Sequence, residues 1–320
     1  MKTNFKKIGL IALATLVFSS CTNNDSSTPT PATAAAFKGI KENGLKKNTQ
    51  NFTATAGAGV ITLTSTKGVV ITLNGNALTK NGSPVTGAID ITFVELFDKG
   101  NMLISNKPTM GVMVDGKKSL LKSGGEFFIK ASQGGVDLVT TSSIQLKVPA
   151  SLTGGVDPLM TLWTGAIDAN DNLAWNEVAA TAGGKGGVTP QGGIYFVTFG
   201  SFGWTNVDRF YSDPRPKTTI LVGPPAGYNI TNCAIFISYD GEGSAMANLD
   251  TYTAAGLFSE HYGQIPIGLA CHIIFVSEDN GQWKYAIKAA TITAGAVYNF
   301  TLAETTTGTE AQVIAAINAL

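Results

Sequence analysis

The sequence predicts an all-β protein with two antiparallel β-sandwich domains and a short C-terminal helix. Three observations lead to this class. Glycine is abundant, with 37 residues, and threonine, valine and isoleucine are frequent, while few helix-forming residues occur in long runs. Short apolar runs follow one another along the chain, separated by turn residues. A helical pattern closes the chain.

The first sandwich domain is expected over residues 51–212. The separators Asn81-Gly82 and Asp115-Gly116 place glycine where a tight hairpin needs a positive φ. Short strands with such turns between them are typical of an antiparallel sandwich. Seven apolar runs are predicted as its strands: residues 53–56, 60–65, 69–73, 87–97, 109–114, 125–132 and 143–148.

Aromatic residues concentrate in a middle segment, residues 159–211, which extends this domain. It contains Trp163, Trp175 and Trp204. The segment leads into Asp213-Pro-Arg-Pro216, whose two prolines disfavour both helix and ladder pairing. We therefore place the domain boundary at residue 213.

The second domain, residues 213–320, repeats the β pattern and ends in the predicted helix. Thr309 and Gln312 have the spacing of a capping box. The side chains that follow on one helical face are Val313, Ile314, Ile317 and Leu320. Five strands are predicted before them: residues 218–222, 233–239, 270–277, 284–293 and 297–302.

The N-terminal residues predict export. Residues 1–7 carry three lysines and no acid, and residues 8–18 form an uncharged, mostly apolar run. This run is well short of the roughly 20 residues that a membrane-spanning helix needs. The sequence therefore indicates a signal peptide rather than a retained membrane span.

Leu16-Val-Phe-Ser-Ser-Cys21 resembles the lipobox of bacterial lipoproteins, in which the cysteine is diacylated and becomes residue one. Phe18 departs from the small or aliphatic residue usual at its position. The resemblance implies that residues 1–20 are removed and that Cys21 carries the lipid, such as palmitate. Residues 21–50 are then expected to be a flexible tether, because the polar stretch after Cys21 is rich in Asn, Ser, Thr and Pro. The alternative is an ordinary secretion signal that leaves Cys21 as a free thiol.

Two further resemblances concern the folded domains. Gly68-Val-Val-Ile-Thr-Leu-Asn-Gly-Asn-Ala-Leu78, followed by residues 87–95, resembles the ZU5 domain, which implies a β-sandwich that mediates interactions and has no catalytic residues. Asn74 departs from the proline turn that is more usual there. The second domain resembles the Ig-like and transthyretin-like modules of bacterial surface proteins, through Ile265-Pro-Ile-Gly268 and Thr291-Ile-Thr-Ala-Gly295.

The charge of the mature chain argues against nucleic acid as a partner. The 22 basic residues include three lysines of the signal, so the mature chain has 22 acidic against 19 basic residues. With no basic stripe, nucleic acid is not expected as a partner.

Enzyme motifs are mostly missing. The only two histidines, His261 and His272, are too far apart for the pairs found in zinc sites. The nearest approach to a nucleophile elbow, Gly241-Glu-Gly-Ser-Ala245, lacks its final glycine. No catalytic residue, metal or cofactor is therefore predicted.

Several polar residues have two interpretations each. His272, within an apolar strand, is interpreted as a structural histidine. Asp168, Asn170 and Asn172 copy the start of a calcium loop, but Ala179 stands where a bidentate glutamate belongs, so a hairpin turn is preferred. Five residues of the stretch 240–263 could converge on a cation or form an acid–base pair, and solvated loop charges are the preferred alternative: Asp240, Glu242, Asp250, Glu260 and His261.

Tryptophans and cysteines also leave alternatives open. Trp163, Trp175 and Trp204 could form a stacking face for sugar rings, although core packing is the preferred interpretation. Cys233 and Cys271 form either a disulfide or two buried free thiols.

Together these observations predict a lipid-anchored envelope lipoprotein of the outer membrane, facing the periplasm or the cell surface. Its expected function is that of a non-catalytic interaction or structural module. The expected partners are the membrane, through the lipid, and an envelope protein or a glycan. The alternative is a glycan-binding or glycan-processing surface lipoprotein that uses the middle-segment tryptophans.

Overall fold

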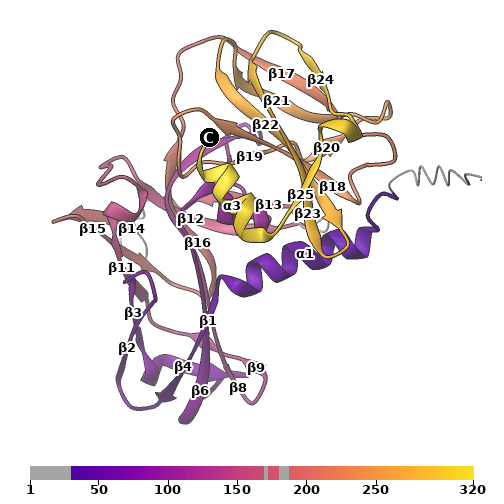
Figure 1. Ribbon diagram of the computed structural model, residues 1–320. Helices are drawn as coiled ribbons and strands as arrows, with labels where there is room; N and C mark the ends of the chain where they lie inside the picture. Colours follow the sequence, from indigo (N-terminus) through magenta and orange to yellow (C-terminus); the bar gives the residue numbers. More distant parts are fainter. Residues whose placement is uncertain (1–29, 169–171, 180–186) are drawn as a thin grey trace, which may run out of the picture. The chain divides into compact units, whose positions relative to one another are not determined.

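The computed structural model describes residues 30–168, 172–179 and 187–320 and confirms the all-β class with a short C-terminal helix (Figure 1). None of the helices in these residues is long and apolar enough to cross a membrane. Three are α-helices: α1 (Ala34–Lys47), α2 (Lys99–Ile104) and α3 (Glu310–Asn318). Three are short 3-10 helices: η1 (Gly75–Ala77), η2 (Ala150–Thr153) and η3 (Leu302–Glu304).

An eight-stranded sheet forms the main layer of the first half. Its longest strand, β8, pairs with β6 along one part of its length and with β7 along another. In order across the sheet its strands are β1 (Thr49–Ala56), β6 (Gly87–Leu96), β8 (Lys118–Gln133), β16 (Gly203–Phe210), β12 (Thr161–Ile167), β13 (Leu173–Glu177) and β7 (Met110–Val112), with β9 (Val136–Asp137) on β8.

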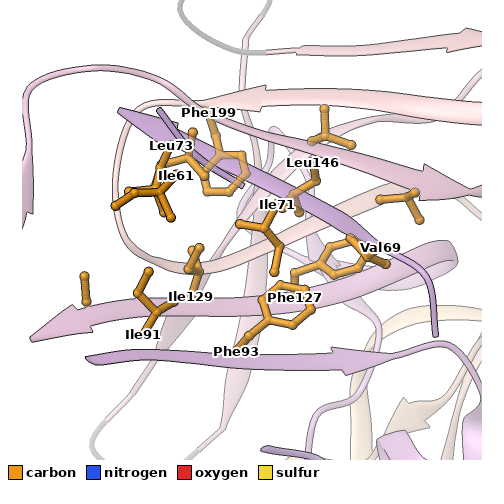
Figure 2. Packing of buried hydrophobic residues seen from close by; sticks show 14 of the residues in the cluster. Ile61, Val69, Ile71, Leu73, Ile91, Phe93, Phe127, Ile129, Leu146 and Phe199 are labelled. Atoms are coloured by element: carbon orange, nitrogen blue, oxygen red, sulfur yellow. The ribbon is translucent and has the colours of Figure 1, made fainter. Parts of the chain in front are cut away.

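A second sheet packs against this layer. Figure 2 shows Phe93 and Ile91 of β6, and Phe127 and Ile129 of β8, beside side chains of the second sheet. These apolar residues form the first core. The second sheet contains β14 (Gly187–Gln191), β15 (Ile194–Phe199), β11 (Ile144–Pro149), β3 (Val70–Asn74) and β2 (Val60–Thr64), and a small third sheet contains β10 (Val139–Thr140), β4 (Leu78–Lys80) and β5 (Ser83–Pro84).

The eight-stranded sheet closes on itself at one end. Strand β7 pairs both with β8 and with β13, so the path β8–β16–β12–β13–β7 returns to β8 as a ring. A β-bulge bends β8 where Asn206 faces Glu126 and Asp208 faces Ser123. The ring is built from β7, from the aromatic middle segment and from β8, whose N-terminal part begins at Lys118, before the predicted strand at 125–132.

The second half is built from two further sheets. Phe275 and Ile237 lie in the second core between them. One sheet contains β20 (Thr251–Tyr252), β21 (Phe258–Pro266), β17 (Lys217–Gly223) and β24 (Val297–Asn299), and the other contains β19 (Ala247–Asn248), β18 (Cys233–Tyr239), β22 (Ala270–Asp279), β23 (Gln282–Thr291) and β25 (Thr306–Gly308). The stretch 240–263, expected to connect strands, thus contains β19, β20 and part of β21.

Helices and loops join the two halves. The backbone N–H groups of Lys99, Thr109 and Ser123 donate to the carbonyl oxygens of Gly243, Met246 and Ser244, at 3.2, 2.9 and 3.1 Å. Residues 31–320 form one compact unit as a result. A junction cluster of buried residues crosses the same boundary and includes Phe37, Ile40, Val94, Phe236, Ile274, Trp283, Val313 and Ile317.

Helix α3 forms as its sequence predicts. Thr309 caps it, and both hydrogen bonds of the capping box with Gln312 are present. Val313 and Ile317 are buried in the junction cluster, and Ile314 and Leu320 pack beside them.

Part of the expected flexible tether at residues 21–50 is instead ordered, because Ala34–Lys47 form helix α1. Thr33 caps the helix by accepting a hydrogen bond from the Ala36 N–H at 3.1 Å. Phe37 and Ile40 lie on one helical face and are buried, so this stretch gains enough apolar contact to be ordered. Residues 21–29 of the expected tether, and the signal before them, lie outside the described residues.

Candidate functional site

Trp163 and Trp175 lie in the interior of the closed ring, with exposures of 1% and 0%. Their indole N–H groups donate to the carbonyl oxygens of Asp208 and Pro108, at 2.9 and 3.0 Å. Trp204 is half-buried, and its ring centroid lies 6.3 Å from that of Trp175. Of the two alternatives, core packing, the preferred one, describes Trp163 and Trp175, because their rings and N–H groups are used within the core, and neither can form a sugar-stacking face.

Cys233 and Cys271 are free, buried thiols. Both lie in the paired strands β18 and β22, but Cys233 faces Ser277 whereas Cys271 faces Tyr239. Six residues of strand thus separate them, a distance of about 20 Å at 3.3–3.4 Å per residue, which a disulfide cannot span. Burial raises the pKa of both thiols, that of Cys271 to about 12. Of the two alternatives, the structure has the free thiols.

The acidic residues of the stretch 240–263 do not converge. Asp240 pairs with His272 at 2.8 Å, Glu242 pairs with Lys122 at 3.1 Å, and Asp250 pairs with Lys118. Within the described residues no group of three or more His, Cys, Asp or Glu side chains is arranged to hold a metal ion.

Glu260 departs from the expectation of a solvated loop charge. It lies in β21, is 3% exposed, and accepts hydrogen bonds from the backbone N–H groups of Tyr262 and Gly263 at 3.0 and 3.1 Å. Burial raises its pKa to about 7, against the effect of these hydrogen bonds. Its neighbour His261 is exposed and lies 3.2 Å from the Thr251 hydroxyl.

Asp168 and Asn172 bracket the link between β12 and β13. The Asp168 N–H donates to the Asn172 carbonyl at 3.0 Å, and the Asp168 carboxylate accepts from the Asn172 N–H at 2.9 Å. The antiparallel register on either side agrees with the preferred hairpin. Asn170 lies outside the described residues.

Sequence reasoning missed a pair of wholly buried carboxyl groups at the β8 bulge, Glu126 and Asp208. Both side chains are 0% exposed. Asn206 donates a side-chain hydrogen bond to Asp208 and accepts one from the Ser123 hydroxyl at 3.0 Å. Both oxygens of Glu126, and Oδ1 of Asp208, have no hydrogen-bond partner in the described chain. The signal in the sequence that could have revealed this pair was Glu126, a single acidic residue directly before the apolar run 127–129.

The two carboxyl groups favour the protonated state. Burial, followed by repulsion from Asp208, raises the pKa of Glu126 well above its ordinary value, and the positive charge of Lys107 opposes this shift. Burial likewise raises the pKa of Asp208. A carboxylic acid in this position can hold a proton, but no substrate can reach it.

A groove beside α1 is the best candidate for a binding site. It has a volume of about 400 Å³. Its walls come from α1, from the loop after α2, from the residues before β18 and from the segment 248–250, so both halves of the protein contribute. The residues used below are Lys38, Lys41, Asn106, Asn248 and Asp250.

The polar groups of this groove come from separate elements. Asn106 is buried and has a φ of 55°, a left-handed conformation that is uncommon for residues other than glycine. Asn248 ends β19 and is 8% exposed. Asp250 accepts hydrogen bonds from the Lys118 ammonium and, at 3.2 Å, from the Tyr262 hydroxyl. Lys38 and Lys41 bring positive charge from α1. Sequence reasoning named only Asp250 of these five residues.

No model of a known protein family matches the chain, and no curated protein matches it either. The fold and the groove define an all-β protein with a candidate binding site at the junction of its two halves. The resemblances to a lipobox, to ZU5 and to Ig-like modules stay sequence-based predictions.

Proposed function

We propose that the protein is a lipid-anchored envelope lipoprotein whose all-β body acts as a non-catalytic interaction module. The sequence around Cys21 supports the anchor, and the groove beside α1 carries the interaction. Small-molecule sites occur preferentially at junctions between domains, as concave surfaces with a few convergent polar groups. The groove beside α1 has both properties.

The charges of the groove support binding rather than catalysis. General acid–base catalysis needs a titrating group within reach of the substrate. Asp250 is instead held by Lys118 and Tyr262, and its side chain is 10% exposed. The carboxyl groups with strongly raised pKa values, Glu126 and Asp208, are wholly buried and do not line the groove beside α1. We therefore assign the groove the role of holding a partner without transforming it.

The anchor is tested by expressing the wild-type chain and the Cys21→Ala variant in a bacterial host. When the protein is partitioned between a detergent phase and an aqueous phase, we expect the wild type in the detergent phase, because two acyl chains give stable anchoring. The mass of its N-terminal peptide should include these acyl chains. Cys21→Ala should move to the aqueous phase, and the matched control Cys271→Ala should keep the lipid. Equal partitioning of wild type and Cys21→Ala would refute the lipoprotein assignment.

The absence of catalysis is tested separately on the purified, delipidated body. We expect no turnover above background across a panel of ester and glycoside substrates. Turnover that survives in the groove variants Asn248→Ala and Lys38→Ala would place an active site elsewhere in the chain. Turnover that these variants abolish would convert the groove into an active site. Either result overturns the non-catalytic proposal.

A further inference from the structure

A second concave site, which we call the Tyr239 pocket, opens at the edge of the second core. Its walls come from the start of β8, from the end of β16 and the residues after it, and from β17, β18 and β21. We infer that this pocket binds one neutral sugar ring, through hydrogen bonds to Tyr239, Ser119 and Gln264 and apolar contact with Phe210. The site is separate from the groove beside α1 and does not depend on it. Its volume of about 290 Å³ lies at the lower end of the range of small-molecule sites, which suits a single ring.

The Tyr239 hydroxyl is the observation that points to a ligand. Tyr239 is 3% exposed, and its ring packs edge-to-face against that of Tyr211, with 5.1 Å between the centroids. Its hydroxyl makes no hydrogen bond to any described residue, yet it is not fully enclosed, so its accessible part opens on the pocket that Tyr239 lines. The Tyr228 hydroxyl in the same core differs, because it is fully enclosed. A nearly buried hydroxyl without a protein partner is normally satisfied by water or by a ligand.

Tyr239 keeps its proton at neutral pH. Burial, followed by the charge of Glu260, raises the pKa of Tyr239, and the charge of Asp213 in the pocket wall acts in the same direction. A protonated phenol both donates and accepts a hydrogen bond. A ligand hydroxyl, which also does both, is its natural partner.

The charged groups of the pocket wall are paired with each other. The Lys217 ammonium lies 3.7 Å from the Asp213 carboxylate, whose side chain is 7% exposed. Arg215 donates to the same carboxylate at 3.0 Å, and this interaction lowers the pKa of Asp213. An anionic ligand would be repelled by Asp213 and a cationic one by Lys217. The wall therefore favours a neutral ligand.

The rest of the wall combines neutral hydrogen-bonding groups with apolar surface. Gln264 donates through Nε2 to the Tyr262 carbonyl at 3.4 Å, which leaves its amide oxygen as an acceptor for a ligand. Ser119 adds a hydroxyl, and Phe210 and Leu120 add apolar contact. A sugar ring has hydroxyl groups around its edge and C–H groups on its faces, so it matches both kinds of surface.

A small phenol is the nearest competitor for this pocket. Its ring fits the apolar surface, and its single hydroxyl satisfies Tyr239. It offers nothing to Ser119 or Gln264, whereas a hexose has further hydroxyl groups for both. The phenol is therefore a separate arm of the experiment.

The test is a saturation-transfer NMR titration of the full, delipidated chain. The neutral probes are the methyl glycosides of glucose, galactose and mannose, and the competing probes are p-cresol, glucuronate and glucosamine. We expect at least one methyl hexoside to bind with a dissociation constant on the order of 1 mM, because a single ring has few atoms with which to gain affinity. The neutral-sugar assignment is wrong if no hexoside binds, or if any competing probe binds as tightly as the best hexoside.

Variants locate the site. Tyr239→Phe removes only the hydroxyl and should weaken binding of the best hexoside by about fivefold or more. Gln264→Leu removes the amide and should weaken it by about threefold or more. The matched control is Tyr228→Phe, which removes the fully enclosed hydroxyl from the same core and should bind as the wild type does.

Circular dichroism confirms that each variant is folded. Unchanged binding by Tyr239→Phe, or an equal loss in Tyr228→Phe, would place the ligand outside the Tyr239 pocket. Either result leaves the lipid anchor and the groove beside α1 to their own tests.

Discussion

Strands β8 and β16 present two buried faces with opposite chemistry. On one face, Phe127 and Val207 enter the first core, where Phe127 lies 6.1 Å from the Phe93 ring by centroid distance. On the other face lie Glu126, Asn206 and Asp208, which are equally inaccessible. The first face is covered by a partner sheet. On the second, the positive charge of Lys107 acts on Glu126, and the N–H of Ser123, which faces Asp208, donates to the Ser244 carbonyl of the second half.

This difference separates two sources of stability. Burial of apolar area stabilises the sandwich whatever the pH. Burial of carboxyl groups costs free energy unless they are hydrogen-bonded or protonated, so the polar face depends on pH and on its covering segments. The stability of the junction between the halves is therefore expected to depend more strongly on pH than that of the sandwich core.

The largest effect is expected on the apolar face. Phe127→Ala should lower the free energy of unfolding by about 3–5 kcal/mol, because it leaves a cavity among rings that cannot close around it. Urea denaturation followed by tryptophan fluorescence measures the change. Val60→Ala is the control, since Val60 is 71% exposed and a surface change is usually worth less than about 0.5 kcal/mol. A loss below 1 kcal/mol for Phe127→Ala would show that the first core is not tightly packed.

An intermediate effect is expected where α1 packs against the junction. In Gly44→Ala the new Cβ would lie 2.5 Å from the backbone oxygen of Ile104, and backbone atoms cannot easily move away. We expect a loss of about 1–3 kcal/mol from overpacking. Gly39→Ala on the same helix meets nothing within 4 Å and should gain about 0.5–1 kcal/mol from helix propensity. Equal effects of the two variants in urea denaturation would show that α1 is not packed against α2.

The smallest change in the free energy of unfolding is expected when the pH rises by one unit, and it comes from the polar face. Folded Glu126 keeps its proton above pH 4.5, its ordinary pKa, whereas the unfolded chain loses it there. The folded state then binds more protons, so stability falls as pH rises from 4.5 towards the raised pKa. For one proton the slope is at most about 1.4 kcal/mol per pH unit.

Glu126→Gln removes this slope, because glutamine keeps the shape and cannot ionise. Urea denaturation at a series of pH values should give a shallower decline for the variant than for the wild type. Asp208, and Glu260 with its pKa of about 7, contribute in the same direction, so part of the decline should persist. Glu177→Gln on the exposed surface is the control. Identical pH profiles of wild type and Glu126→Gln would contradict a protonated Glu126.

Much of the strand pattern was predictable because alternation and turns are local signals. The strand Cys233–Tyr239 and the helix after Thr309 form where their sequences indicate. Helix α1 was missed because its polar composition resembles the preceding tether, and only Phe37 and Ile40 show that it packs. The extension of β8 before residue 125 was missed because its first residues alternate poorly and depend on β7 and β16 for pairing.

The candidate site was predictable only in part, because its residues come from separate parts of the chain. Asp250 was named from its chemistry, but its place beside Lys38 and Asn248 depends on how α1 and the second half pack. For the tryptophans, the sequence identified the residues but not their environment. Their number indicated either a binding face or a core, and only the closure of β7 onto β8 and β13 places Trp163 and Trp175 inside.

The sequence by itself determined the all-β class, the turns and the C-terminal helix, because each follows from residues near one another in the chain. It also contains the lipobox-like segment at Cys21. Only the tertiary structure decided that Cys233 and Cys271 stay apart, that Glu126 and Asp208 are buried together, and that a groove opens beside α1. Each of these depends on strand register or on packing between residues far apart in the chain, and no local pattern specifies such distances.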